Sequence, residues 1–500
     1  MAPLNVNSAI LGSLLRPDAW LLIGVLAVVG YVVYERFLSP CAGIPGPFFA
    51  SLSRWWMIKH TLEGDMHRVM IQQHEKYGSL VRTGPNELSI SDLSAIRKIY
   101  GPGSKFRKSD WYSVWQGHRK FDLFAERNES IHGAQRKLVA RAYAMETLKD
   151  LEEYVNNATR VFIQRMDEMQ DQVVDMGKWV QLYAFDVIGE ITFSKRFGFM
   201  DVGEDDGTFG AIEGILGSAS WIGQVPWLFW LHDYLQPVIG NHLKVNARHG
   251  GVRNFAAREV AARKDRGSDH NDILSKLFAV QKDKPEFEDT SVLSMATSNV
   301  AAGSDTTAIS LRAMVWYLLK YPECKQKLVE EIDERRRQGK LSDPVQLEEA
   351  DQMPYLQAVM WEALRLHPAV GMSLPRVVPV GGTEFDGHYL PAGTIVGVNP
   401  WVVQRNKEVY GEDVETFRPE RWLNKEDKGD MQRYFFAFGA GARLCIGKNI
   451  SWLEMSKLIP TLFMHFDITL EDSDAELKET CWWFVIQKGL NVKLNRRIRA

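Results

Sequence analysis

Cysteine is scarce in this chain of 500 residues, which contains only Cys41, Cys324, Cys445 and Cys481 and has no C-x-x-C pair. Four cysteines are too few to crosslink a chain of this length, so we expect a reducing compartment and no structural zinc site. The sequence also lacks a G-x-G-x-x-G fingerprint and a P-loop, so we expect no dinucleotide-binding or fused flavin module.

Neither sign of charge dominates the chain. Lys and Arg number 60 and Asp and Glu number 63, so the net charge is -3 and no overall basic field favours nucleic acid as a partner. A composition of 45% hydrophobic and 25% charged residues excludes a disordered or collagen-like chain. No repeat of fixed period is present, and the unbroken composition indicates one large domain or two closely packed ones.

A long hydrophobic run lies near the N terminus, between Asp18 and Glu35. It falls slightly short of the ~20 residues that cross a ~30 Å hydrocarbon core, but flanking aromatic and basic side chains can extend it. We predict a short tail over residues 1–18 and a single transmembrane anchor over residues 19–36. The alternative is a cleaved secretory signal, which is less favoured because Arg16 is offset by an acidic residue where a signal should be basic.

A proline-rich segment follows the hydrophobic run, with Pro40 and the sequence Ile44-Pro45-Gly46-Pro47. Proline fixes the backbone and cannot continue a helix. We therefore predict a stiff hinge over residues 37–54 that orients the main body, residues 55–500, against a membrane. An ordinary surface linker is the alternative.

Helical patterns dominate the main body, with apolar residues three and four positions apart. The predicted helices cover residues 64–77, 131–141, 145–169, 176–193, 246–264 and 323–337. Short strand patterns cover residues 79–82, 87–90 and 374–403, the last interrupted by Gly and Pro. The sequence therefore predicts a mainly helical fold with small β-sheets.

One further helix is expected to begin at a cap at Asp289-Thr290 and to run to about Lys320, and it contains an unusual insert. The insert reads Ala301-Ala302-Gly303-Ser304-Asp305-Thr306-Thr307. A glycine inside a helix costs ~1 kcal/mol relative to alanine, and threonine hydroxyls that bond to helix carbonyls bend it. Such departures from local rules often mark function.

A glycine-rich segment near the C terminus surrounds one cysteine and reads Phe436-Ala437-Phe438-Gly439-Ala440-Gly441-Ala442-Arg443-Leu444-Cys445-Ile446-Gly447. It precedes an apolar helix predicted over residues 448–466. A glycine-rich turn lets backbone approach a flat ligand, and its amides can donate to a thiolate in front of a helix. A lone cysteine is more often inert and buried, but this context favours an ionised sulfur that binds a ligand.

Phe438, Gly441, Arg443, Cys445 and Gly447 resemble the heme-binding signature of the cytochrome P450 monooxygenases. The resemblance implies the cytochrome P450 fold, heme b as the cofactor and Cys445 as the proximal ligand of the heme iron. A thiolate ligand pushes electron density onto iron and favours cleavage of the O–O bond.

Two other segments resemble motifs of the same family. Glu362-Ala363-Leu364-Arg365 is similar to its E-x-x-R motif, and the segment 417–422, which contains Arg421, is similar to the partner of that motif. Residues three apart share a helix face, so Glu362 and Arg365 can pair and meet Arg421. The resemblance implies that this triad stabilises the core on the heme side.

The helix insert resembles the A-G-x-D-T oxygen-activation motif of the family. The resemblance implies that Asp305 relays protons, that Thr306 holds them at the dioxygen site and that Gly303 leaves room for dioxygen. In the alternative, Thr306 only bends a core helix.

The heme carboxylates require cations, and the resemblance implies Arg443, Arg376 and Arg136. His132 stands four residues before Arg136, where many relatives carry Trp, and its imidazole can still donate to a carboxylate. Gln404 departs from a histidine that is frequent among relatives.

Together, these motifs imply a membrane-anchored monooxygenase that uses dioxygen to oxidise a lipophilic small molecule. The sequence is similar to fungal microsomal members of secondary-metabolite pathways, which implies a terpenoid or polyketide-like substrate. A separate NADPH-dependent flavoprotein reductase would supply electrons, and the catalytic domain of the single-pass protein would face the cytosol at the endoplasmic reticulum. The alternatives are a heme-thiolate isomerase or dehydratase, which the intact Asp305 and Thr306 disfavour, and a noncatalytic heme-binding protein.

The resemblance also implies which segments line the substrate pocket. They are residues 111–124, 299–306, 370–374 and 481–484, which are rich in Trp, Phe and Leu. Such a lining favours a sizeable apolar substrate held mainly by shape.

Overall fold

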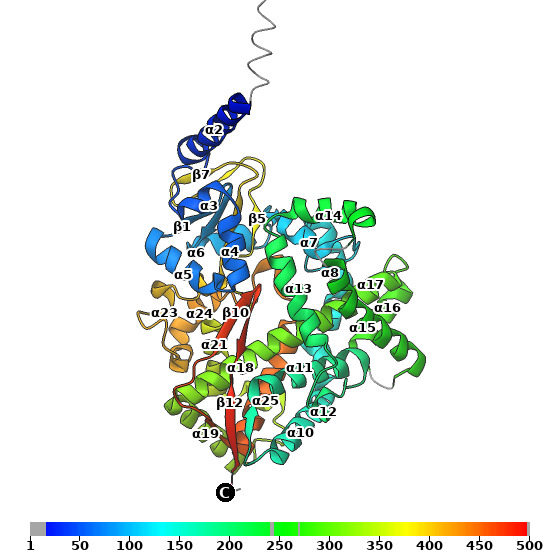
Figure 1. Ribbon diagram of the computed structural model, residues 1–500. Coiled ribbons are helices and arrows are strands. Elements are labelled where there is room, and N and C mark those ends of the chain that lie inside the picture. The colour runs from blue at the N-terminus through cyan, green and yellow to red at the C-terminus, as the bar shows by residue number, and fades with distance from the viewer. Residues whose placement is uncertain (1–16, 241–244, 269–270, 498–500) are drawn as a thin grey trace, which may run out of the picture.

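The computed structural model describes residues 17–240, 245–268 and 271–497. Helices dominate these residues, and four small β-sheets lie among them (Figure 1). The predicted mainly helical fold is therefore confirmed. The predicted N-terminal tail lies outside the described residues as far as residue 16.

The helices fall into three runs along the chain. The first run is α2 (Pro17–Val33), α3 (Phe48–Leu52), α4 (Trp55–Glu63), α5 (Met66–Tyr77), α6 (Leu93–Tyr100), α7 (Ser113–Gln116), α8 (Glu129–Val139) and α9 (Met145–Lys149). The second is α10 (Glu152–Glu168), α11 (Met176–Phe193), α12 (Phe199–Val202), α13 (Thr208–Ile222), α14 (Pro226–Ile239), α15 (Val245–Arg266), α16 (Ile273–Asp283), α17 (Asp289–Ser298), α18 (Ser304–Lys320) and α19 (Pro322–Arg337). The third is α20 (Leu347–Asp351), α21 (Pro354–Leu366), α22 (Pro400–Val403), α23 (Lys407–Tyr410), α24 (Lys425–Tyr434) and α25 (Lys448–His465).

Short π-helical and 3-10 helical turns connect several of these helices. The π-helical, wider turns are η1 (Tyr34–Leu38) and η4 (Asn299–Gly303), and the 3-10 turns are η2 (Asp110–Tyr112), η3 (Ala140–Tyr143), η5 (Pro419–Trp422) and η6 (Gly441–Arg443).

The largest sheet has five strands in the order β1 (Leu80–Gly84), β2 (Glu87–Ile90), β8 (Ile395–Gly397), β5 (Arg376–Val377) and β3 (Arg107–Lys108). Its β2–β8 pair is parallel, whereas its other pairs are antiparallel. The three smaller sheets are β4 (Val173–Asp175) with β12 (Asn491–Arg496) and β9 (Phe466–Leu470), β10 (Lys478–Trp482) with β11 (Phe484–Lys488), and β6 (Thr383–Phe385) with β7 (His388–Leu390).

The predicted helices are present, with two local differences from the sequence reading. The predicted helix 145–169 is divided into α9 and α10, because the N–H of Leu151 bonds to Leu148 O at 2.9 Å in a tightened turn. The predicted strand region 374–403 is wrong at its end, where α22 begins at Pro400. The side chain of Asn399 caps this helix by accepting from the Trp401 N–H at 2.9 Å.

Helix α18 runs through the centre of the main body and packs against α11 and α25 (Figure 1). Its Ala308, Leu311 and Val315 side chains are fully buried. Because α25 begins three residues after Cys445, this central packing fixes the cysteine loop relative to the helix that carries Thr306.

The N-terminal helix α2 projects away from the main body (Figure 1). Together with η1 it forms a stretch, Trp20–Leu38, whose 19 residues are long and apolar enough to cross a membrane. The last turn of this stretch contacts the main body through Glu35, which forms a buried ion pair of 2.5 Å with Arg82 of β1. Arg82 also donates to the backbone oxygen of Glu35 at 2.7 Å.

The segment predicted to be a stiff hinge, residues 37–54, also contacts β1. The Arg82 N–H donates to Pro45 O at 2.8 Å, and a Cβ added at Gly46 would lie 2.3 Å from Arg82 O. Tyr31 of α2 donates to Leu52 O at 2.7 Å. These contacts seat the chain between the hydrophobic run and the main body directly against β1.

We expect Glu35→Gln to lower the free energy of unfolding by about 3 kcal/mol, because it leaves the buried guanidinium of Arg82 without a counter-charge. Chemical denaturation of the full chain in detergent measures this loss. The matched control is Glu412→Gln, which removes an exposed partner of Lys407 and should leave the transition midpoint unchanged. Equal behaviour of the two variants would show that the Glu35–Arg82 pair contributes nothing to stability.

Candidate active site

The cysteine loop is a closed turn that only glycine permits at one position. The Cys445 N–H donates to Phe438 O at 3.0 Å, which joins the two ends of the loop. Gly441 has a φ of 62°, and a Cβ there would lie 1.8 Å from Tyr100 O. Any side chain at this position would therefore force the loop away from the end of α6.

Cys445 is the one exposed cysteine, whereas the other three are buried. Gly441 and Ala442 of the same loop are exposed as well. The exposed sulfur is the first requirement for a residue that binds a metal-containing ligand.

Although Cys445 is accessible, its sulfur lies deep within the protein, and this burial raises the pKa of the thiol above its ordinary value. The amides of Gly447 and Lys448 and the guanidinium of Arg136 lower that pKa without offsetting the burial. These donors act in the direction that the sequence predicts, and an ionised sulfur at Cys445 stays a prediction for the protein with its metal bound. A metal cation at the sulfur would supply the missing stabilisation of the thiolate.

The three predicted arginines and one further cation lie around one buried imidazole. His132 on α8 is 2% exposed, and burial together with four neighbouring cations lowers its pKa to about 3. In order of their effect, these cations are Arg443, Lys108, Arg136 and Arg376. His132 is therefore neutral at physiological pH and has one ring N–H to donate.

Arg443 has a free donor inside this cluster. Its Nε and Nη2 donate to the Glu129 carboxylate at 3.0 and 2.8 Å, at the first turn of α8. Its Nη1 is buried, and no partner for it occurs among the residues that the structure describes. An anionic oxygen is the ligand that this orphaned donor lacks.

Lys108 belongs to the cluster but was not identified from the sequence. Its side chain is 6% exposed, and its Nζ lies 4.1 Å from the ring centroid of Tyr112 and donates to Phe124 O. Burial, and then repulsion by Arg376, hold its pKa well below the ordinary value. Lys108 lies in a two-residue strand without a motif, so no local signal marks it.

These observations fit the heme that the resemblance implies. A cluster of cations that repel one another, with a spare buried donor, suits two carboxylates, and the exposed sulfur suits the iron. Cys445 would hold the metal, and Arg443, Arg376, Arg136, Lys108 and His132 would hold the carboxylates.

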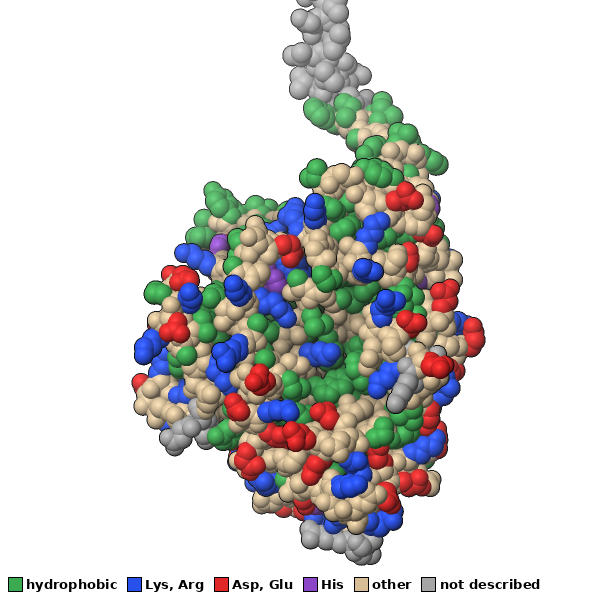
Figure 2. Space-filling model, turned by 180° about the vertical axis from the view of Figure 1, so that it is seen from behind, with side chains coloured by type: hydrophobic (Ala, Val, Ile, Leu, Met, Phe, Trp, Pro, Cys, Tyr) green, Lys and Arg blue, Asp and Glu red, His purple; other side chains and the backbone are tan. Residues whose placement is uncertain are grey.

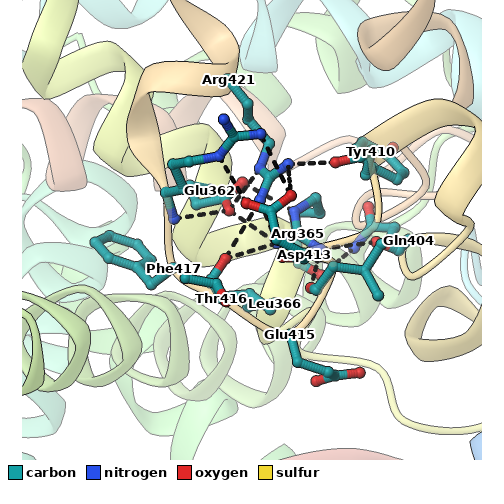
Figure 3. A network of polar contacts seen from close by, with 12 residues as sticks. Glu362, Arg365, Leu366, Gln404, Tyr410, Asp413, Glu415, Thr416, Phe417 and Arg421 are labelled. Atoms are coloured by element: carbon teal, nitrogen blue, oxygen red, sulfur yellow. Dashed lines mark hydrogen bonds and ion pairs between the residues drawn. The ribbon is translucent and has the colours of Figure 1, made fainter.

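The structure brings the three buried residues of the predicted triad together in one network (Figure 3). Arg365 donates to both oxygens of Glu362 at 2.8 Å, and Arg421 Nε donates to Glu362 Oε1 at 2.8 Å. Burial would raise the pKa of Glu362, but the two guanidinium groups hold it below its ordinary value. The remaining donors of Arg365 bind backbone carbonyls, including Val414 O at 2.7 Å.

Gln404 connects this network to the cysteine loop, a role that the sequence did not reveal. Its Nε2 donates to Leu364 O and Arg365 O at 3.1 and 3.0 Å, and its Oε1 accepts from the Phe436 N–H at 2.9 Å. The end of α21 and the start of the loop are thus joined through one buried amide. The departure from histidine at this position therefore has a structural consequence.

The insert at residues 301–307 distorts the helix formed by α17, η4 and α18, here called the distal helix, as the sequence indicates. The wider turn η4 stands between α17 and α18, and the Oγ1 atoms of Thr306 and Thr307 bond back to Ala302 O and Gly303 O at 2.8 and 3.0 Å. Thr306 is half-buried and Ala302 is exposed, so this face of the helix borders open space.

Asp305 points away from that face. Its Oδ1 accepts from Gln181 Nε2 on α11 at 2.7 Å, and the described hydrogen bonds include none between Asp305 and Thr306. Burial raises the pKa of Asp305 to about 6, although Arg312 and Gln181 act to lower it. A proton relay from Asp305 would therefore require water or a turn of the carboxyl group.

Gly303 has a packing role that the sequence did not show. A Cβ at this position would lie 2.7 Å from Ile188 Cδ1 on α11, so the absent side chain lets α11 and η4 approach closely. Its predicted role in leaving room for dioxygen stays a prediction.

Two polar links hold α25 against the distal helix. Thr307 and Ser451 share a hydrogen bond of 2.9 Å between their hydroxyl oxygens. Asn449 donates to Tyr143 O at 3.0 Å, and the Tyr143 hydroxyl donates to Asn299 Oδ1 at 2.8 Å. The separation between the cysteine loop and Thr306 is therefore set by bonds at the start of η4 and in the first turn of α18.

Two of the predicted pocket segments, 370–374 and 481–484, lie side by side. The Gly371 N–H donates to Trp483 O at 2.9 Å. Trp483, at the tip between β10 and β11, has a φ of 77°, a conformation rare for a bulky residue, and its ring lies 4.5 Å from that of Trp111. A third segment, 111–124, thus joins the same aromatic cluster.

Comparison with known proteins agrees with this site. The family model described as Cytochrome P450 matches residues 45–495. The Cytochrome P450 monooxygenase hepC of Aspergillus oryzae is 41% identical over 496 residues, which cover 94% of this chain and 97% of that protein. Pisatin demethylase of Fusarium vanettenii is 37% identical over 469 residues, covering 91% and 89%. The Cytochrome P450 monooxygenase gsfF of Penicillium aethiopicum is 37% identical over 498 residues, covering 95% and 98%.

The chain therefore belongs to the cytochrome P450 family and is a cytochrome P450 monooxygenase. Membership of this family implies heme as the cofactor.

We expect Gln404→Leu to destabilise the protein by about 2 to 4 kcal/mol, because two carbonyls and one amide lose their buried partner. Denaturant unfolding measures the loss, and the absorption of thiolate-ligated heme shows whether the loop keeps its cofactor. The control Gln338→Leu alters an exposed glutamine and should change neither. Normal stability of Gln404→Leu would mean that the loop holds its position without this amide.

Proposed function

We propose that this cytochrome P450 is a membrane-anchored heme-thiolate monooxygenase that oxidises a lipophilic secondary metabolite. The observation that carries the proposal is the exposed Cys445 sulfur beside a cluster of buried cations with a spare donor on Arg443. When bound, heme with a thiolate ligand supplies the activation of dioxygen. The roles of the residues below follow from this assignment.

Thr306 and Asp305 are proposed to manage protons on the distal side. The Thr306 hydroxyl is bonded to Ala302 O and borders open space, so it can accept a hydrogen bond from a ligand or a water. Asp305, with a pKa of about 6, can exchange a proton close to neutral pH. Gly303 is proposed to leave room for dioxygen beside them.

Electrons are proposed to come from NADPH through a separate flavoprotein reductase, because the sequence has no dinucleotide fingerprint. The alternatives make different predictions. An isomerase or dehydratase needs no reductase, and a noncatalytic heme-binding protein would show no substrate-dependent consumption of NADPH.

The substrate is proposed to be a sizeable apolar molecule of the terpenoid or polyketide type. Support comes from the aromatic cluster, in which Trp111, Trp115 and Phe124 gather around Trp483. The fungal relatives, which include a demethylase and several monooxygenases, support a role in secondary metabolism.

The protein is proposed to be a single-pass protein of the endoplasmic reticulum with residues 19–36 as the anchor, residues 37–54 as a stiff connection and residues 55–500 as the cytosolic heme domain. Tyr31, which donates to Leu52 O at 2.7 Å, and Glu35, which pairs with Arg82, tie the end of the hydrophobic stretch to the main body, and cleavage after Glu35 would remove both contacts; this supports a retained anchor. Hydrophobic side chains also gather on α14, at the same end of the molecule as α2 (Figures 1 and 2). Among them, Tyr234 and Val238 are more than four-fifths exposed, at 81% and 86%.

The first test is the carbon monoxide difference spectrum of the reduced protein in microsomes, beside that of Cys445→Ala. We expect a strongly red-shifted Soret band in the natural chain and its loss in the variant, because only a thiolate ligand produces that shift. A band typical of imidazole ligation, or the same band in Cys445→Ala, would overturn the assignment of the metal ligand.

We expect Thr306→Ala to lower the product formed per NADPH by roughly ten- to a hundredfold and to divert electrons to hydrogen peroxide, since protons then reach dioxygen without control. Product and peroxide are measured together in membranes that contain the reductase. Thr306→Ser keeps the hydroxyl and should retain most of the coupling. Full coupling in Thr306→Ala would reduce Thr306 to a residue that only bends the helix.

A further inference from the structure

Gln181 on α11 stands between Asp305 and Arg312, and both of these lie on α18. Its Nε2 donates to Asp305 Oδ1 at 2.7 Å, and its Oε1 accepts from Arg312 Nη2 at 2.5 Å. All three side chains are at least nine-tenths buried. The glutamine does not belong to the motif that identified Asp305, and it comes from a different helix.

The orientation of the Gln181 amide is fixed by the chemistry of its neighbours. A guanidinium group has donors only, so the oxygen of the amide must face Arg312 and the nitrogen must face Asp305. Arg312 is itself held in place, because its Nε donates to Gly177 O at 2.8 Å. The amide is thus a rigid spacer that transmits hydrogen bonding but carries no charge.

This spacer leaves one oxygen of Asp305 without a donor. Asp305 Oδ2 is buried, and no partner for it occurs within the described part of the chain. An unpaired carboxylate oxygen in such a place favours a bound proton. The nearby cation Arg312 opposes protonation, whereas Glu213 of α13 and Asp205, which precedes it, favour protonation.

A direct ion pair would have the opposite effect. A guanidinium in contact with an aspartate lowers the pKa of the carboxyl by about 1 to 3 units, so the carboxyl would stay ionised near neutral pH. With the amide between them, burial prevails and the pKa of Asp305 is about 6. The same carboxyl can then both gain and lose a proton under physiological conditions.

We propose that Gln181 is a positioning residue for proton delivery: it binds Asp305 Oδ1, separates the carboxyl from Arg312 and leaves Oδ2 as the atom that carries the exchangeable proton. The proposal rests on the role given to Asp305 under the proposed function. It adds Gln181, on a second helix, as the residue that sets the pH range in which Asp305 can exchange a proton.

The test is infrared titration of the holoenzyme, which follows the C=O band of a protonated carboxyl group without any turnover. The band that disappears in Asp305→Asn belongs to Asp305. In the natural chain we expect its midpoint near the pKa of about 6. Leucine in Gln181→Leu still fills the space between the carboxyl and Arg312 but donates no hydrogen bond to the carboxylate, so the midpoint should rise by about one pH unit.

A second variant, Gln181→Glu, keeps the shape of the side chain and its contact with Arg312. It places a second carboxyl group against Asp305, so the midpoint should rise further than in Gln181→Leu. The control is Gln224→Leu, because Gln224 is also a buried glutamine with an arginine donor, Arg54, at 3.1 Å. Its loss should leave the Asp305 band unchanged.

If Gln181 only supports packing, the variants will unfold at lower temperature while the Asp305 midpoint stays at its natural value, and the proposal is then wrong. A natural chain in which Asp305 shows no protonated band in the accessible pH range overturns it as well. The product formed per NADPH gives an independent comparison. The pH above which this yield declines should rise in Gln181→Leu together with the Asp305 midpoint.

The two proposals fail in different ways. Absence of NADPH-dependent product in the natural chain would contradict the proposed function, whereas the infrared titration would still decide the role of Gln181. A midpoint that shifts in Gln181→Leu without any change in the pH dependence of coupling would contradict the link to proton delivery.

Discussion

The heme-side core depends on one buried carboxylate. Glu362 accepts hydrogen bonds from Arg365 and Arg421, and also from the indole of Trp422 at 2.8 Å. Glu362 thereby holds two guanidinium groups out of water, which is favourable only because their other donors find backbone carbonyls and, for Arg421, the Asp413 carboxylate at 3.2 Å. The chain between α21 and the cysteine loop has little regular structure, and these bonds give it a defined path. Through Gln404 that path reaches Phe436, where the cysteine loop begins.

The cationic cluster on the other side of the loop has the opposite character. Lys108, Arg376 and Arg443 lie near one another, and burial, together with the repulsion between these cations, lowers the pKa values of Lys108 and His132. Such a cluster costs stability in the protein alone and gains it when an anionic ligand binds. Folding and retention of the cofactor are therefore coupled, and the loss of cofactor should weaken the packing of α8, β3 and the loop together.

Motifs predicted the centre of the site, because each is a short stretch whose residues act where they stand. Cys445, Arg443, Glu362 and Thr306 are of this kind, and most helix positions followed from the spacing of apolar residues. Lys108, Glu129 and Gln181 could not be predicted, since each acts across more than 100 residues of sequence or from a segment without a motif. The rise that burial causes in the pKa of the Cys445 thiol could not be predicted either, because desolvation depends on the packed surroundings rather than on the loop sequence.

The contact between Glu35 and Arg82 has a consequence for the geometry of encounters at a bilayer. A domain on a flexible tether samples many heights and tilts. Here a buried ion pair joins the end of the apolar stretch to β1, and the short chain segment that follows lies against the same strand. In the membrane location that we propose, the heme domain would be presented at a nearly constant height. An encounter with a partner held in the same bilayer then requires lateral diffusion in two dimensions and little rotational search.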